Sequence, residues 1–311
     1  MQQRPKVYLQ RCDKYSIERL KQFLDTCFAS DTSHSFRSAK VLIKPNLITA
    51  RRYGPATTDP RFILALGEWF VDSGAAVYIG DSPAFGSAAG VLEALSVKKE
   101  LIKRGISIVE FSQGQKVDLP CGVNVTIASS VFENDYFINA PKVKAHNQVY
   151  VTLAVKNIFG IVKGLQKSML HMRHGGTDNV FVKIIVDLID ILPKNYSVVD
   201  GIEVMHRQGP VHGDPLNLGC VAFSDNPIAL DSALISLLQL EHRKSPLWRE
   251  AEKRGCRGNE VDALEYPLLS PESFHGSGFQ PPAQLSPIRF NPFRFVAGNI
   301  KRLLHPLFVS R

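Results

Sequence analysis

The chain has 311 residues, 44% of them hydrophobic, so it can bury a full core as one large domain or as one domain with a small appendage. Its formal net charge is +8, but the cations are dispersed and no nucleic-acid-binding motif accompanies them, which disfavours nucleic acid as a partner. No apolar run reaches about 18 residues and the polar start lacks a signal-peptide core, so we expect a cytoplasmic protein without a membrane span.

Strand patterns alternate with amphipathic helix patterns along the first 240 residues, which predicts an α/β fold with a mainly parallel open sheet and helices on both faces. The first strands are expected at about 6–10, 41–43, 76–80 and 106–111. The helical segments between them are expected at about 16–28, 60–73 and 88–104. Residues 123–127 have the pattern of one arm of an inserted β-hairpin.

The next expected strand begins at Tyr136 and leads into Pro141-Lys-Val-Lys-Ala-His146. Because side chains alternate along an extended chain, Lys142, Lys144 and His146 would project from the same side. Two ammonium groups and an imidazole gathered together are costly unless an anion, a metal-bound anion or a cofactor lies among them. This pattern predicts the active or binding site here, and a basic strand end that runs into solvent is the alternative.

Lys156-Asn157 follows an apolar stretch that could be strand or helix, and Phe159-Gly160 predicts where that stretch ends. A buried lysine near other cations has the lowered pKa that a general base or an imine-forming amine needs, so Lys144 and Lys156 are candidates. Permanent cations that hold an anionic ligand are the alternative. His146 is the better acid–base candidate, because the unperturbed pKa of histidine lies near neutrality.

His171 and His174 are three residues apart, a spacing that places both on one helix face and can supply two metal ligands. No third ligand is evident nearby, although Asp178 or His146 could reach. The alternative is a mobile basic lid over an anion, formed by Lys163, Lys167, Arg173 and the Gly175-Gly176 pair. The loop at 205–214, which also carries histidine and glycine, could complete the pocket.

Later patterns predict helices at 181–192 and 228–240 and strands at 196–200 and 218–223. Open α/β sheets bind ligands beyond the carboxyl ends of their strands, so the polar residues that end the strands should share one crevice. The expected ligand-binding residues are Lys44, Asn46, Asp81, Ser82, Lys142, Asn157 and Asp200. The lysines would hold a phosphate or carboxylate, and the two aspartates would orient them or cap the helices that follow.

These residues lie in seven short sequence segments that follow one another along the chain. They are Val41-Leu-Ile-Lys-Pro-Asn46, Thr57-Thr-Asp-Pro60, Ile79-Gly-Asp-Ser-Pro83, Pro141-Lys-Val-Lys-Ala-His146, Lys156-Asn-Ile-Phe-Gly160, Val199-Asp-Gly201 and Asp225-Asn-Pro-Ile-Ala-Leu-Asp231. In these blocks the chain resembles the domain-of-unknown-function 362 family. The resemblance implies an architecture and a site but no settled reaction. The family's fold is similar to the amino-terminal region of the nickel-pincer lactate racemases, which makes a metal or organometallic cofactor conceivable here.

Many members of that family carry a ferredoxin-like cluster module with tightly spaced cysteines after the core domain. An iron–sulfur cluster needs about four thiolates, usually from a dense local run. The five cysteines of this chain are scattered, and only Cys256 lies beyond residue 241. We therefore expect reduced, structural cysteines and no self-contained iron–sulfur module, and the cofactor stays unknown.

The composition changes after residue 240, so we divide the chain into an α/β domain at 1–240 and a C-terminal extension at 241–311. Residues 267–292 are rich in Pro, Ser and Gly, as in a linker or an irregular wrap over the core. Residues 293–307 form an amphipathic helical pattern with Arg294, Lys301 and Arg302 on the polar face. This basic tail could lie on an anionic membrane surface, dock onto a protein partner or pack onto its own domain.

These patterns predict an enzyme, of redox or isomerase type, that binds a carboxylated or phosphorylated small molecule or an anionic metallocofactor in a crevice lined by lysine and histidine. Lys142, Lys144 and Lys156 would hold or activate the ligand, and His146 would move protons. The competing class is a non-catalytic accessory protein that delivers a ligand or cofactor to a partner and is peripheral to the membrane through its tail.

Overall fold

The computed structural model describes residues 3–29, 35–48, 54–83, 86–174 and 179–286. Its main sheet contains β1 (Tyr8–Arg11), β2 (Lys40–Pro45), β3 (Ala76–Asp81), β4 (Ser107–Glu110), β7 (Tyr136–Ala140), β8 (Lys142–His146), β9 (Tyr150–Thr152), β10 (Lys194–His206) and β11 (Asp214–Ser224). The helices are α1 (Ile17–Ala29), α2 (Pro60–Asp72), α3 (Ala88–Ala94), α4 (Lys98–Lys103), α5 (Ala154–Ile158), α6 (Gly164–His174), α7 (Val180–Asp187), α8 (Pro227–Leu237) and α9 (Pro246–Lys253).

The sheet is mainly parallel, as expected. Its order is β1-β11-β10-β7-β2-β3-β4, and the pairs from β10 to β4 are all parallel. Strand β11 runs antiparallel to both β10 and β1. The long strand β10 pairs first with β7 and then, farther along, with β8, which in turn pairs antiparallel with β9. Strand β10 therefore fixes β8, the lysine-bearing strand, relative to the centre of the sheet.

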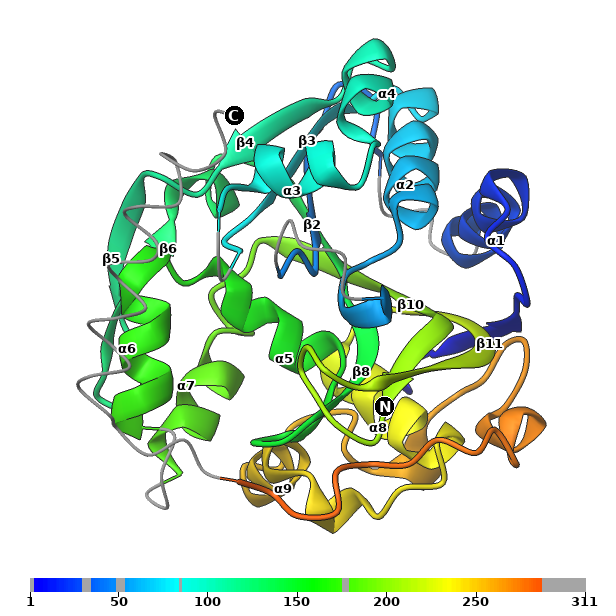
Figure 1. Cartoon of the computed structure of the whole chain (residues 1–311), viewed down its shortest axis with the longest axis vertical. Helices are drawn as coiled ribbons and strands as arrows, with labels where there is room; N and C mark the ends of the chain where they lie inside the picture. The colour runs from blue at the N-terminus through cyan, green and yellow to red at the C-terminus, as the bar shows by residue number, and fades with distance from the viewer. Residues whose placement is uncertain (1–2, 30–34, 49–53, 84–85, 175–178, 287–311) are drawn as a thin grey trace.

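Helices cover both faces of the sheet because successive strand residues point to opposite sides. Val41 and Ile43 of β2 belong to the core that includes α1, α2 and α3, whereas Leu42 belongs to the core that includes α5 and α7. A third core joins β8 and β11 to α8. Figure 1 shows α2 and α4 together on one side of the molecule and α8 and α9 on another.

The inserted β-hairpin is confirmed. It consists of β5 (Gly114–Asp118) and β6 (Asn124–Ala128), which pair antiparallel apart from the main sheet. Figure 1 places the hairpin beside α6 and α7. Two hydrogen bonds join it to the start of α6: the Lys163 amide donates to the Thr126 carbonyl at 2.8 Å, and the Thr126 amide donates to Gln166 Oε1 at 2.5 Å.

Residues 241–286 wrap over the α/β core. The Val7 amide donates to the Glu265 carbonyl at 2.9 Å, and the Leu269 amide donates to the Leu9 carbonyl at 3.1 Å, so this segment covers the outer edge of β1. Phe274 and Phe279 are buried in the core that contains α8. The amphipathic helix expected at 293–307 lies outside the described residues. Within the described ranges, no helix is both long and apolar enough to cross a bilayer.

An aromatic cluster joins α1 to the sheet. Phe28, which is 6% exposed, lies 4.8 Å from Trp69, 5.0 Å from Tyr196 and 4.9 Å from Phe223 between ring centroids. Such pairs are stabilising beyond their buried area, and truncating a buried phenylalanine also leaves a cavity.

Phe28→Ala should lower the free energy of unfolding by about 3–5 kcal/mol, because it removes a ring that contacts α2, β10 and β11. Urea denaturation followed by circular dichroism would measure this change. The matched control is Phe132→Ala, at a ring that is 37% exposed, which should cost about 1 kcal/mol or less. Equal losses in the two variants would contradict this assignment of the core.

Candidate functional site

Strand β8 presents its charged residues on one side, as the alternation predicts. Val143 and Ala145 pack into the core with α8, which leaves Lys142, Lys144 and His146 on the opposite side. All three are buried, with exposures of 6% or less. A basic strand end running into solvent is therefore not what the structure has.

A pocket of about 190 Å³ opens where β2, β3, β8 and α5 meet. Its polar lining residues are Lys44, Asn46, Asp81, Ser82, Lys144, His146, Thr152, Lys156, Asn157, Lys167 and His171. Most of the expected site residues thus come together. Four lysines face one aspartate within the described lining, so the pocket has an excess of positive charge.

Lys44 has a carboxylate partner, Asp81. Its Nζ lies 2.8 Å from Asp81 Oδ1 and donates to the Pro45 carbonyl at 3.0 Å and to Asn157 Oδ1 at 3.3 Å. Asp81 Oδ2 also accepts from the Leu47 amide at 2.7 Å. Burial lowers the pKa of Lys44, while Asp81 opposes that shift. This ion pair connects β2 to β3 at the floor of the pocket.

Lys144 is buried without a carboxylate partner among the described residues. Its Nζ donates to Asn46 Oδ1 at 2.6 Å and to the Ala56 carbonyl at 2.8 Å, which leaves one N–H for the pocket. Burial and the nearby ammonium of Lys156 hold the pKa of Lys144 well below its usual range. Neutral acceptors only partly compensate for the burial of this cation.

Lys156 has neither a hydrogen bond nor an ion pair in the described part of the chain. It is 9% exposed, and its Nζ lies 4.8 Å and 5.6 Å from the ring centroids of Phe159 and Phe181. Burial, with smaller effects of Lys167 and Lys44, lowers its pKa from 10.5 to about 7. An amine of that pKa is a competent base or nucleophile at neutral pH.

His146 is held as a neutral ring with one defined tautomer. Its Nδ1 accepts from the amides of Gln148 at 3.1 Å and Val149 at 3.4 Å, so the proton of the neutral ring is on Nε2. Burial and the ammonium groups of Lys156 and Lys144 hold its pKa well below 6.5. At neutral pH His146 is therefore a neutral N–H donor. The unperturbed pKa of histidine had suggested a group that gains and loses a proton near neutrality.

Thr152, which the sequence did not single out, contributes a buried hydroxyl. It is 2% exposed and lies opposite Lys144 in the β8–β9 pairing. Its Oγ1 has no hydrogen-bond partner among the described residues. A buried polar atom of this kind normally has a partner, so this hydroxyl on the pocket wall can form a hydrogen bond with a molecule in the pocket.

Asn157, Asp231 and Gly160 position α5 and its lysine. Asn157 Nδ2 donates to Asn139 Oδ1 at 2.8 Å, and Asp231 Oδ1 accepts from the Ala154 amide at 2.7 Å at the start of the helix. A Cβ at Gly160 would lie 2.5 Å from Lys44 Nζ and 2.8 Å from Asp81 Oδ1, so a side chain there would displace the ion pair. The sequence indicated Phe159-Gly160 as a stop, and α5 does end at Ile158, followed by a short 3-10 turn over Phe159–Ile161.

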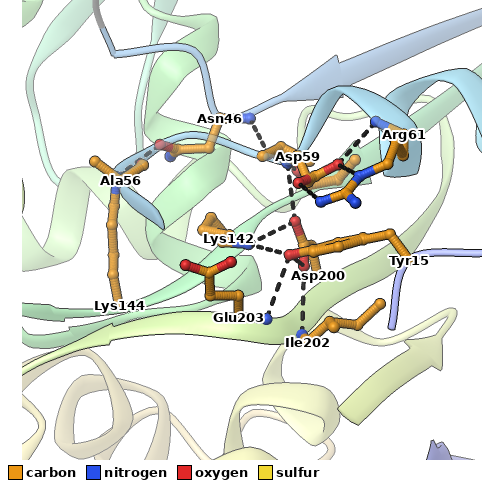
Figure 2. Close-up of polar contacts among 12 residues, drawn as sticks. Tyr15, Asn46, Ala56, Asp59, Arg61, Lys142, Lys144, Asp200, Ile202 and Glu203 are labelled. Atoms are coloured by element: carbon orange, nitrogen blue, oxygen red, sulfur yellow. Dashed lines mark hydrogen bonds and ion pairs between the residues drawn. The ribbon is translucent and has the colours of Figure 1, made fainter. Parts of the chain in front are cut away.

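Lys142 and Asp200 do not line this pocket. Lys142 Nζ donates to Asp200 Oδ2 at 2.8 Å and to the Tyr15 hydroxyl at 2.6 Å, and Asp200 Oδ2 also accepts from the Asp59 amide at 2.9 Å. Figure 2 shows these side chains converging on Asp200 while Lys144 extends toward Ala56. Lys142 of β8 and Asp200 of β10 thus form hydrogen bonds with each other, and Asp200 also binds the backbone at the start of α2. These bonds hold the three elements together.

The two histidines lie on helix α6, which also carries Lys167 and Arg173, so this part of the expected lid is helical and the lid itself stays a prediction. His171 of α6 lies on the pocket wall, with its ring stacked 6.4 Å from that of His146. Burial holds the pKa of His171 well below 6.5. His174 is absent from the pocket lining, and no group of three or more His, Cys, Asp or Glu side chains in the described ranges could hold a metal ion. The two-histidine metal site stays a prediction, and Asp178 and Gly175-Gly176 lie outside the described residues.

The loop after β10 closes one side of the pocket through Pro210 and Val211. Gly209 packs against β8, where a Cβ would lie 1.7 Å from the Ala145 carbonyl oxygen. Its amide donates to Asn147 Oδ1 at 3.1 Å. The loop at 205–214 thus joins the pocket as expected, although through apolar residues rather than its histidines.

Comparisons with known proteins agree on the family. The family model described as Domain of unknown function (DUF362) matches residues 41–236. The thylakoid-associated protein sll1697 of Synechocystis sp. is 34% identical over 264 residues, which cover 84% of this chain and 82% of that protein.

One solved structure with the same fold is the lactate racemase apoprotein from Thermoanaerobacterium thermosaccharolyticum. It superposes with a TM-score of 0.50 at 10% sequence identity. The match covers 76% of this chain and 57% of the racemase chain. The expected similarity in fold is confirmed, and at this identity it extends to the fold alone.

The shifted pKa of Lys156 predicts a pH dependence of stability. Between the folded pKa of about 7 and the usual 10.5, the unfolded chain binds more protons, so the free energy of unfolding should rise with pH. Below pH 7 Lys156 is protonated in both the folded and the unfolded chain. The folded chain then bears the full free-energy cost of burying the ammonium group. The stability advantage of Lys156→Met over the wild type should shrink by about 2–4 kcal/mol between pH 7 and pH 10.

Urea denaturation in a phosphate-free buffer would measure this change. The other lysines of the pocket are present in both proteins, so their contributions to the pH dependence of stability largely cancel. They are Lys44, Lys144 and Lys167. Lys116→Met, at an exposed lysine of β5, is the control and should run parallel to the wild type. A Lys156→Met curve that is also parallel would contradict the shifted pKa.

Proposed function

The chain belongs to the DUF362 family, and we propose that its lysine-rich pocket binds a small carboxylated or phosphorylated molecule on which the protein acts as an enzyme. The observation that carries this proposal is the charge of the pocket: Lys44, Lys144 and Lys156 are buried in its lining, and among the described residues only Lys44 of these three pairs with a carboxylate, that of Asp81. Several buried ammonium groups without matching carboxylates are costly, and an anion between them offsets that cost.

The unused hydrogen-bonding groups of the pocket define what the ligand must provide. Lys156, the third N–H of Lys144 and Nε2–H of His146 are donors without a described acceptor. The Thr152 hydroxyl can donate as well. A ligand that satisfies these groups must carry several acceptor oxygens, as a carboxylate or a phosphate does.

Catalysis is favoured over passive binding by the environment of Lys156. A pocket that only holds an anion gains from lysines that stay charged. Lys156 instead lies against two aromatic rings, without a carboxylate, at a pKa of about 7. Shifted titratable groups of this kind are typical of active sites.

An anionic metallocofactor is the less favoured ligand. The described pocket lining supplies two imidazoles, those of His146 and His171, and no thiolate. These groups could hold the anionic part of a cofactor but do not form a metal-ligand set of three. The donor-rich lining suits an organic or inorganic oxyanion better.

Titration calorimetry with inorganic phosphate, oxalate and lactate would test anion binding. At least one of these anions should bind, and Lys144→Met should weaken its binding about 10–100-fold, because a charge-assisted hydrogen bond contributes about 1.5–3 kcal/mol. Lys116→Met should bind as the wild type does. If none of the anions binds, or if Lys144→Met binds with unchanged affinity, the proposed site is wrong.

The second candidate is an accessory protein that acts at a membrane surface. Two observations support it: the relative from Synechocystis sp. is named as thylakoid-associated, and the sequence at 293–307 combines an apolar face with Arg294, Lys301 and Arg302. A basic amphipathic segment binds anionic lipid through apolar burial and charge attraction together.

Removal of residues 293–311 should abolish co-sedimentation with vesicles that contain phosphatidylglycerol, and it should leave anion binding unchanged. The full-length double variant Ile300→Gln/Leu304→Gln keeps the charge but weakens the apolar face, so it should reduce vesicle binding as well. A truncated chain that sediments with vesicles like the full chain would exclude this role for the tail.

A further inference from the structure

We propose that the ligand of the pocket is a small 2-oxo acid and that Lys156 captures its carbonyl carbon as an imine. This inference rests on the anion-binding function proposed above and adds to it the substrate class and a covalent step. It follows from three features of the pocket: an unpartnered amine, a separate set of donors for a carboxylate and a carbonyl oxygen, and a restricted volume.

The amine is placed and activated for nucleophilic attack. Lys156 Nζ lies against the rings of Phe159 and Phe181, at 4.8 Å and 5.6 Å from their centroids, and has no acceptor in the described part of the chain. At a pKa of about 7, roughly half of this lysine is the free amine at neutral pH, whereas an ordinary lysine is almost entirely ammonium.

The remaining donors match the two oxygen-bearing groups of a 2-oxo acid. The unused N–H of Lys144 can bind the carboxylate, since Asn46 and the Ala56 carbonyl take its other two. The Nε2–H of His146 can donate to the ketone oxygen, and a neutral imidazole in this role polarises a carbonyl. The orphaned Thr152 hydroxyl supplies a further donor on the same wall.

The volume sets the size of the acid. A cavity of about 150 Å³ accommodates benzene, which has six non-hydrogen atoms. The pocket of about 190 Å³ therefore has room for an acid of two to five carbons. Pyruvate and glyoxylate are within this limit.

The step balances without a further reagent. The lone pair of Lys156 Nζ forms a bond to the carbonyl carbon as the C=O π electrons move to oxygen, which gives a carbinolamine. The C–O bond then breaks and C=N forms, and the carbonyl oxygen leaves as water with two protons that were on nitrogen. In the imine of pyruvate, once protonated, the C=N group withdraws electrons from the methyl carbon next to it, which prepares that carbon for loss of a proton.

Borohydride trapping tests the inference directly. The full-length protein is incubated with pyruvate or glyoxylate at pH 7.5, reduced with sodium borohydride, digested and analysed by mass spectrometry. Hydride adds to the imine carbon, so Lys156 should carry a carboxyethyl group from pyruvate or a carboxymethyl group from glyoxylate. Binding of each acid is followed in parallel by thermal shift.

Three variants make the result specific. Lys156→Met and Lys156→Arg should both lose the adduct. Because arginine keeps a positive charge at the same position, the second variant distinguishes the effect of the charge from that of the nucleophilic amine. Lys116→Met should be labelled at Lys156 as the wild type is. Thermal unfolding by circular dichroism verifies that each variant is folded, and loss of fold in one Lys156 variant leaves the other to decide.

Each outcome has a distinct meaning. An adduct confined to Lys156 supports the inference. A thermal shift without an adduct, or an adduct on another lysine, overturns the imine at Lys156 and leaves anion binding in place. No adduct and no shift with either acid, while phosphate binds, overturns the 2-oxo acid assignment alone. No shift with any anion overturns both this inference and the proposed function.

Discussion

Burial of ammonium groups without enough carboxylates is the constraint on which the site depends. Lys44 has Asp81, whereas Lys144 has only amide and carbonyl oxygens and Lys156 has two aromatic rings. Each arrangement offsets a different fraction of the desolvation cost, and the pKa of all three lysines is lowered. The neighbouring asparagine network and the missing side chain at Gly160 are needed to keep these cations in place.

Much of the fold could be predicted because it depends on local patterns. The alternation in β8 and the hairpin arm at 123–127 needed only periodicity and turn residues. The separation of Lys142 from Lys144 could not be predicted in this way. It depends on Tyr15 and Asp200, which lie 127 and 58 residues from Lys142 in the chain.

The site was predicted in part for the same reason. Strand ends brought Lys44, Asp81 and Lys144 together as the general rule for α/β sheets requires. Thr152 was missed because a threonine in an apolar strand gives no signal until its partners are known. The neutral state of His146 also depends on neighbours distant in sequence, above all Lys156. The comparisons place the chain in a family and a fold, so its chemistry has to be argued from these side chains.

The long strand β10 imposes an order on folding. Strands β2, β7 and β8 are all made before residue 147, but β8 joins the sheet through β10, which ends at His206. The first strand, β1, pairs with β11, which ends at Ser224. During synthesis the lysines of β8 therefore emerge well before Asp200 and the sheet that buries them. Such distant pairings slow folding, and the unfinished sheet exposes unpaired strand edges to chaperones and to other nascent chains.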